Sequence, residues 1–237
     1  MTPPVRFGVL AFGDSITNGG GELQCGVALQ SWAQWLARGL GMPFTNLAVD
    51  GARCADVLAE QIPRLERSTA KPRAVYDVGC LYIGVNDVRS VDWNLPAYEK
   101  ALDGALEWLG RRCDRVLVCT LPGDLGRPRA TERVTQANEA IARAASAHRV
   151  LLLDLSRFGA RNFVMADQVH PTAFGQIAIA ERALAVLAAD GLATRLPPRS
   201  LIRYETPRRS RLRGDWTYVY RRGKVAVRAH WQRWRAR

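Results

Sequence analysis

Apolar runs alternate with helical patterns along most of the chain, and this alternation constrains the fold more than any other feature. Five runs have the continuous apolar character of strands that are covered on both faces of a sheet. Each is followed by a stretch with apolar residues at helical spacing. The runs span 5–12, 44–49, 74–84, 115–121 and 149–155, and the helical stretches span 29–40, 55–65, 97–109, 132–147 and 173–189.

Strands that alternate with helices in this way predict an open parallel sheet with helices on both faces. Right-handed crossovers leave few strand orders, and we expect the flavodoxin-like order 2-1-3-4-5. Past Leu192 the pattern breaks into a segment rich in proline and arginine. The sequence therefore predicts a three-layer α/β/α domain over residues 1–194, followed by a basic C-terminal extension over 195–237.

The net charge of +12 belongs entirely to this extension, which carries 14 basic and 2 acidic residues. The first 194 residues are electrically balanced. If 217–235 is helical, Tyr220, Val227, Trp231 and Trp234 form one stripe. Three interpretations follow, in order of preference. The stripe packs on the domain, the extension binds an anionic partner such as lipid headgroups or an acidic protein, or it binds nucleic acid, for which no recognition motif is present.

The sequence also bounds the location of the protein. No apolar run approaches the roughly 20 residues that span a bilayer, and the N-terminus does not resemble a signal peptide, so we expect a cytoplasmic protein. The chain has an odd number of cysteines and no C-x-x-C pair, which favours buried reduced thiols over disulfides or a metal site. The cysteines are Cys25, Cys54, Cys80, Cys113 and Cys119.

Polar and glycine-rich residues follow four of the five predicted strands. Ligands bind at the carboxyl ends of the strands in such sheets, so these residues are expected to meet at one edge. The segments are Gly13-Asp14-Ser15, Asp50-Gly51-Ala52, Gly84-Val85-Asn86-Asp87 and Asp167-Gln168-Val169-His170.

These residues supply the parts that acyl transfer needs. Ser15 is the candidate nucleophile, and His170 is the candidate base because His148 and His230 fall away from the predicted edge. Asp167 precedes His170 by three residues, so one turn of chain can bring its carboxylate to the imidazole Nδ1. Asp14 is expected to support the Ser15 loop by local hydrogen bonding.

An oxyanion hole needs donors on the other side of the substrate carbonyl. The candidates are the backbone N–H of Ser15, the backbone N–H of Gly51 and the side-chain amide of Asn86. Each motif alone is weak, because Gly-Asp-Ser and Gly-x-Asn-Asp also suit ordinary turns. Their joint occurrence, in order and at predicted strand ends, favours catalysis.

The motifs resemble the sequence blocks of the GDSL or SGNH hydrolases. "FGDSIT" looks like the first block, "NLAVDGA" the second, "IGVND" the third and "DQVHP" the fifth. The resemblance covers about residues 5–190 and departs from the pattern at Ile16, which replaces leucine, and at the acidic Asp50. It implies a flavodoxin-like fold and ester hydrolysis without a cofactor or metal. Ser15, Asp167 and His170 would form the triad, with Gly51 and Asn86 as oxyanion donors.

The sequence therefore predicts a serine ester hydrolase that forms an acyl-enzyme with a small or medium acyl group, acetyl included. Two alternatives remain. An acyltransferase would use the same triad but pass the acyl group to an alcohol. A catalytically silent binding module would instead dock through its basic tail. Because Ser15 is not centred in Gly-x-Ser-x-Gly, we do not expect an α/β-hydrolase nucleophile elbow, and we expect the serine in a flatter loop.

Overall fold

One parallel sheet forms the centre of the computed structural model, which describes residues 6–21, 27–68, 75–123, 125, 130–160 and 162–202, together with eight positions between 209 and 227. The strand order is β2-β1-β3-β4-β5, as the sequence predicted. In the register, Ala11 of β1 lies between Asn46 of β2 and Cys80 of β3. The strands are β1 (Val9–Gly13), β2 (Phe44–Asn46), β3 (Tyr76–Tyr82), β4 (Cys113–Cys119) and β5 (Leu151–Leu153).

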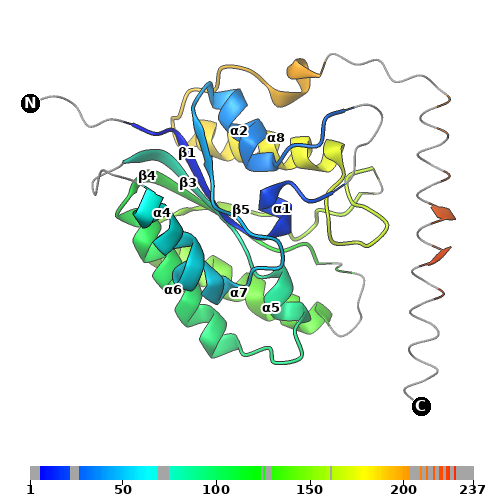
Figure 1. Cartoon of the computed structure of the whole chain (residues 1–237), viewed down its shortest axis with the longest axis horizontal. Helices are drawn as coiled ribbons and strands as arrows, with labels where there is room; N and C mark the ends of the chain where they lie inside the picture. Colours follow the sequence, from blue (N-terminus) through cyan, green and yellow to red (C-terminus); the bar gives the residue numbers. More distant parts are fainter. Residues whose placement is uncertain are drawn as a thin grey trace, which may run out of the picture.

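Helices cover both faces of this sheet, which gives the three layers expected (Figure 1). Helices α2 and α8 pack together on one face, and α4, α6 and α7 lie on the other. The helices that match predicted stretches are α2 (Trp32–Leu40), α6 (Leu95–Gly110), α7 (Ala130–His148) and α8 (Ala173–Ala189). The starts of α2, α6 and α8 are capped: Ser31, Asn94 and Thr172 each accept a hydrogen bond from a backbone N–H of the first turn.

The predicted helix over 55–65 is interrupted by a wider turn. It consists of α3 (Cys54–Asp56), a π-helical segment η1 (Val57–Gln61) and α4 (Ile62–Ser68). The N–H of Ile62 donates to the carbonyl of Val57, five residues back. Pro63 follows directly, and a proline inside a regular helix clashes with the carbonyl four residues earlier. The π turn widens the backbone at this point and lets the helix continue past Pro63.

The core consists of the buried strands and the inward faces of the helices, with Phe12, Trp32 and Leu117 among its fully buried side chains. Cys54, Cys80, Cys113 and Cys119 are buried and free, as predicted, and burial raises the pKa of each thiol. Cys25 lies outside the described residues. Across the part of the chain that the structure describes, no helix has the length and apolar character needed to cross a membrane.

The first residues after the predicted domain boundary pack on the sheet-covering helices. The N–H groups of Arg195 and Leu196 donate to the carbonyl of Gly39, at 2.9 and 3.1 Å. A short 3-10 turn, η2 (Pro198–Leu201), contacts α2 and α8, and Arg199 pairs with Glu181 of α8. Residues 195–202 therefore lie against the α/β domain.

Candidate active site

Two short helices that the sequence patterns did not reveal begin at the carboxyl ends of neighbouring strands. Helix α1 (Ser15–Asn18) starts two residues after β1 ends, and α5 (Val85–Arg89) starts three residues after β3 ends. Gly13 of β1 pairs with Tyr82 of β3, so the two helix starts lie side by side at one edge. The expectation that Ser15 lies in a flat loop is wrong, because Ser15 is the first residue of α1. Runs of four and five residues are too short to show helical periodicity.

Asp14 holds the start of α1. Its Oδ1 accepts a hydrogen bond from the N–H of Ile16 at 2.9 Å, which is the local role expected for it. The side chain is only 1% exposed, and Oδ2 has no hydrogen-bond partner among the described residues. Burial raises the pKa of Asp14 from 3.8 to about 7, and nearby Asp87 adds to this, against the hydrogen bond from Ile16 and the charge of His170.

The structure brings Ser15, His170 and Asp167 into one hydrogen-bonded chain. Ser15 Oγ lies 2.8 Å from His170 Nε2, and His170 Nδ1 lies 2.7 Å from Asp167 Oδ2. Asp167 Oδ1 also accepts from the backbone N–H groups of Val169 and His170. Gln168, which lies between Asp167 and His170 in the sequence, has a left-handed φ of +60°, a backbone conformation that residues other than glycine rarely adopt. The tight Asp-x-x-His turn therefore stores backbone strain where it joins acid to base.

The pairing changes both pKa values in the direction that general-base chemistry needs. The hydrogen bond to Asp167 raises the pKa of His170, and this outweighs the effect of partial burial. Burial alone would raise the pKa of Asp167, but the hydrogen bonds from the His170 side chain and the two backbone N–H groups bring it below its ordinary value. An ionised Asp167 that accepts from Nδ1 is able to fix the imidazole tautomer and to stabilise an imidazolium.

The candidate oxyanion donors come from the start of α1, from the loop after β2 and from α5. The backbone N–H of Ser15 is among the first in α1 and so has no partner within the helix. The N–H of Val49 donates to the carbonyl of Gly13 at 3.1 Å, which holds the loop that contains Gly51 beside the end of β1. Asn86 Nδ2 donates to the carbonyl of Ala52 at 2.9 Å, so the amide is tied to that same loop. Gly51 has a φ of +80°, a conformation that glycine adopts at little cost.

Asp50, the acidic departure before Gly51, is engaged by a neighbouring side chain. Asn18 Nδ2, at the end of α1, donates to Asp50 Oδ1 at 2.9 Å. The Asp50 carboxylate therefore has an amide partner in α1, and the contact links α1 to the loop after β2.

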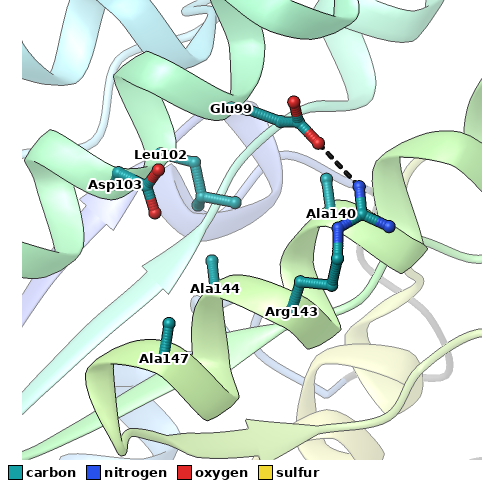
Figure 2. Close-up of a pocket in the computed structure, with 7 residues that line it drawn as sticks. All are labelled: Glu99, Leu102, Asp103, Ala140, Arg143, Ala144 and Ala147. Carbon is teal, nitrogen blue, oxygen red and sulfur yellow. Dashed lines mark hydrogen bonds and ion pairs between the residues drawn. The ribbon is translucent and has the colours of Figure 1, made fainter.

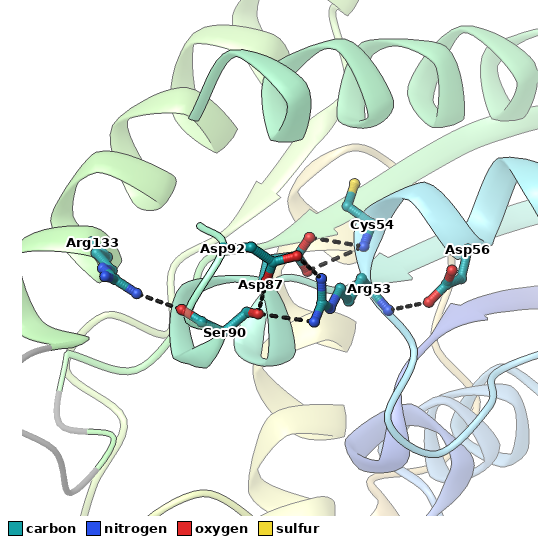
Figure 3. A network of polar contacts seen from close by, with 7 residues as sticks. All are labelled: Arg53, Cys54, Asp56, Asp87, Ser90, Asp92 and Arg133. Atoms are coloured by element: carbon teal, nitrogen blue, oxygen red, sulfur yellow. Dashed lines mark hydrogen bonds and ion pairs between the residues drawn. The ribbon is translucent and has the colours of Figure 1, made fainter. Parts of the chain in front are cut away.

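A polar network joins the loop after β2, which contains Gly51 and Arg53, to the segment after α5 (Figure 3). Arg53 donates to Asp92 at 3.0 Å and to Ser90 Oγ at 2.8 Å, while Arg133 of α7 donates to the carbonyl of Ser90 at 2.5 Å. Both oxygens of Asp87 accept from the N–H of Cys54. Burial raises the pKa of Asp87 to about 6. The sequence predicted no role for Arg53 or for Asp87, although Asp87 is part of the third motif and Arg53 follows the second.

Of the two histidines that the sequence analysis set aside, His148 lies in the described part of the chain. His148, at the end of α7, pairs with Asp103 of α6 at 3.1 Å, and His230 falls outside the described residues. A pocket of about 200 Å³ between α6 and α7 is lined by Leu102, Ala140 and Ala144, with Glu99 and Arg143 paired at its mouth (Figure 2). It contains none of the candidate catalytic residues. Within the described ranges, no group of three or more His, Cys, Asp or Glu side chains could hold a metal ion.

Comparison with known proteins agrees with the fold and the motifs. Residues 11–177 match the model of the GDSL-like Lipase/Acylhydrolase family. The chain belongs to this family. It is therefore a carboxylic ester hydrolase of the GDSL type. No curated protein sequence matches the chain in the corresponding search.

Several solved structures are similar to this GDSL-type hydrolase in fold. An α/β hydrolase enzyme, LAE5, from the metagenome of Lake Arreo in Spain is 21% identical, with a TM-score of 0.60 over 76% of this chain and 94% of that one. Axe2, an acetylxylan esterase from Geobacillus stearothermophilus, is 19% identical, with a TM-score of 0.58 over 76% and 93%. The lipase/acylhydrolase from Enterococcus faecalis is 21% identical, with a TM-score of 0.60 over 80% and 98%.

Proposed function

We propose that this GDSL-type hydrolase cleaves esters through an acyl-enzyme on Ser15. The observation that carries the proposal is the continuous hydrogen-bonded chain from Ser15 Oγ through His170 to Asp167, with contacts of 2.8 and 2.7 Å. A serine hydroxyl is a weak nucleophile until a neighbouring base takes its proton, and a base works best when a third group orients it.

The chemistry proceeds in two balanced steps. Ser15 Oγ attacks the ester carbonyl carbon while His170 Nε2 takes the hydroxyl proton. The carbonyl–alkoxy bond then breaks, His170 returns that proton to the leaving alcohol, and the acyl group remains on Ser15. Water repeats the sequence and releases the acid. The N–H groups of Ser15 and Gly51 and the Asn86 amide stabilise the oxyanion, and each such donor typically contributes on the order of 10²–10³ in turnover.

Short acyl groups suit this site best. Helices α1 and α5 begin almost directly at the ends of β1 and β3, so neither strand end carries an insertion that could enclose a long acyl chain. One structural neighbour is described as an acetylxylan esterase, which also favours acetyl esters. A panel of p-nitrophenyl esters from acetyl to long acyl chains tests this directly. We expect kcat/KM to be highest for the shortest members, and a maximum at long chains would contradict the proposal.

Water and an alcohol compete for the same acyl-enzyme, so the acyltransferase alternative needs its own measurement. The reaction is run with a p-nitrophenyl ester in the presence of a soluble alcohol, and the products are identified by mass spectrometry. Free acid as the main product supports hydrolysis. A transferred ester as the main product would support the transferase.

The C-terminal extension carries a second proposal, which is docking to an anionic lipid surface. Its described positions, which are 209, 212, 216, 219, 220, 223, 224 and 227, are all helical. Five large apolar side chains among them are exposed: Leu212 62%, Trp216 75%, Val219 56%, Tyr220 66% and Val227 59%. Packing of the predicted stripe on the domain is therefore wrong at Tyr220 and Val227, while Trp231 and Trp234 lie outside the described residues.

A strongly cationic segment with exposed apolar side chains has the composition of segments that lie in the membrane interface, where anionic headgroups attract the charges. Co-sedimentation with vesicles of phosphatidylcholine, with and without phosphatidylglycerol, tests this. The full chain should bind only the anionic vesicles, and a chain that ends after Ile202, which keeps the packed segment 195–202, should not.

Two variants separate apolar insertion from simple charge attraction. Trp216→Ser should weaken vesicle binding by roughly 10- to 100-fold, since burying a large apolar side chain is worth about 1.5–3 kcal/mol. Val91→Ser removes an apolar residue that is even more exposed, 98% against 75% for Trp216, but lies in the α/β domain, and it should leave vesicle binding unchanged. Binding to an acidic protein but not to anionic vesicles would overturn the lipid proposal.

A further inference from the structure

Two buried glutamines hold the backbone on either side of Ser15. Gln61, the last residue of the π-helical segment η1, contacts Gly13, two residues before Ser15. Its Oε1 accepts from the N–H of Gly13 at 3.0 Å, and its Nε2 donates to the carbonyl of Gly13 at 2.8 Å. The Gln61 side chain is fully buried. A side-chain amide that bonds both backbone groups of one residue fixes its position and the orientation of its peptide planes.

Gln176, on α8, holds the other side of the same segment. Its Nε2 donates to the carbonyls of Ile16 and Gly20, at 3.0 and 3.1 Å, and its Oε1 accepts from the N–H of Trp32 at 2.7 Å. This side chain is also fully buried. One amide therefore connects both ends of α1 to the start of α2.

The space around the segment leaves little room for it to shift. A Cβ on Gly20 would lie 2.7 Å from the Ser15 carbonyl oxygen and 3.2 Å from His170 Cδ2. The glutamines therefore act on a backbone that already packs against the catalytic imidazole.

We propose that Gln61 and Gln176 are positioning residues for the nucleophile. This inference rests on the proposed role of Ser15. The glutamines do not touch the reacting atoms. They fix Gly13 on one side and Ile16 and Gly20 on the other, which keeps Ser15 Oγ within hydrogen-bond distance of His170 Nε2 and keeps the Ser15 N–H aimed at the oxyanion. Displacement of a catalytic group by about 1 Å can cost on the order of 10² in rate.

The same kind of clamp occurs at another strand end and supplies a matched control. Asn138 of α7 accepts from the N–H of Leu121 at 2.7 Å and donates to the carbonyl of Leu121 at 2.8 Å, just after β4. Loss of this clamp removes the same two bonds at a residue that is not adjacent to the nucleophile.

The test compares Gln61→Met, Gln176→Met and Asn138→Leu with the wild-type chain, at a temperature where circular dichroism shows each to be folded. Ester hydrolysis and the rate of fluorophosphonate labelling are measured. We expect both glutamine variants to lose roughly 10- to 100-fold in kcat and in labelling rate, with KM changed less than about threefold. Asn138→Leu should lower the melting temperature similarly and keep kcat within about twofold.

Gln61→Glu keeps the shape of the side chain, and its buried carboxyl in the protonated form can still accept from the N–H and donate to the carbonyl of Gly13. This variant is the second test in case the methionine variant misfolds, and it should lose less activity than Gln61→Met. Glutamine variants with kcat and labelling rates equal to those of Asn138→Leu would overturn the inference. Failure of the wild-type chain itself to label at Ser15 would instead refute the proposed function, so the two failures are distinguishable.

Discussion

Replacement of Asp14 by asparagine gives a stability change whose sign and size follow from the burial of this carboxyl. Asp14 is 1% exposed, caps α1 through the N–H of Ile16, and has a pKa raised from 3.8 to about 7, chiefly by burial. In the unfolded chain the group ionises near 3.8. Between these values the folded chain keeps a proton that the unfolded chain has lost, so stability falls as the pH rises through this window and levels off above about 7.

The pKa difference of about three units corresponds to about 4 kcal/mol, at roughly 1.4 kcal/mol per unit. Asparagine keeps an oxygen that can accept from Ile16 and does not titrate. The free energy of unfolding of Asp14→Asn, minus that of the wild-type chain, should therefore grow by about 4 kcal/mol from about pH 4 to about pH 8.

Urea unfolding followed by tryptophan fluorescence at several pH values measures this difference. Glu107→Gln is the matched control. Glu107 is exposed and pairs with Arg111 one turn away, so its difference from wild type should stay within about 0.5 kcal/mol at every pH. A flat Asp14→Asn difference, or one that falls with pH, would refute the reasoning that burial governs this group.

Two further predictions concern the site. The acid limb of the pH profile of kcat/KM should have its midpoint above the ordinary histidine pKa of 6.5, because His170 must be neutral to act and its hydrogen bond to Asp167 raises its pKa. Asp167→Asn should move this limb to lower pH and reduce kcat by on the order of 10⁴. A limb that does not move in the variant would contradict this prediction. Gly20→Ala should cut kcat/KM at least roughly tenfold, since its Cβ would lie 2.7 Å from the Ser15 carbonyl oxygen, and overpacking of this kind costs about 1–3 kcal/mol. Gly110→Ala, at the end of α6 with nothing within 4 Å, should leave hydrolysis unchanged, so equal losses in the two variants would argue against a local effect.

The sheet and its long helices could be predicted because apolar runs alternate with stretches that are long enough to show the helical period. The strand order followed from the α/β alternation, and the inward faces of α2 and α6 followed from their apolar spacing. The short helices α1 and α5 and the π turn at Val57–Gln61 could not be predicted, because they span four or five residues and depend on capping and on Pro63.

The residues of the site, too, could be predicted only in part. Ser15, Asp167 and His170 stood out because their chemistry is recognisable in the sequence and their strand ends converge. Gln61 and Gln176 look like ordinary polar positions of amphipathic helices. A glutamine at a position that the apolar pattern places on the inward face is the signal that could have identified them, since buried amides must find partners. The close packing of Gly20 against Ser15 and His170 could not be read from the sequence, because it depends on tertiary contacts.

The central claim is that Ser15 forms the acyl-enzyme, and covalent labelling tests it most directly. The wild-type chain and Ser15→Ala are incubated with a fluorophosphonate, the modified peptide is identified by mass spectrometry, and hydrolysis of p-nitrophenyl acetate is measured in parallel. We expect one adduct on Ser15, with loss of hydrolysis in step with labelling, and neither labelling nor hydrolysis above background for Ser15→Ala. Hydrolysis by Ser15→Ala at the wild-type rate would contradict the account, and an inert wild-type chain would favour the catalytically silent binding module.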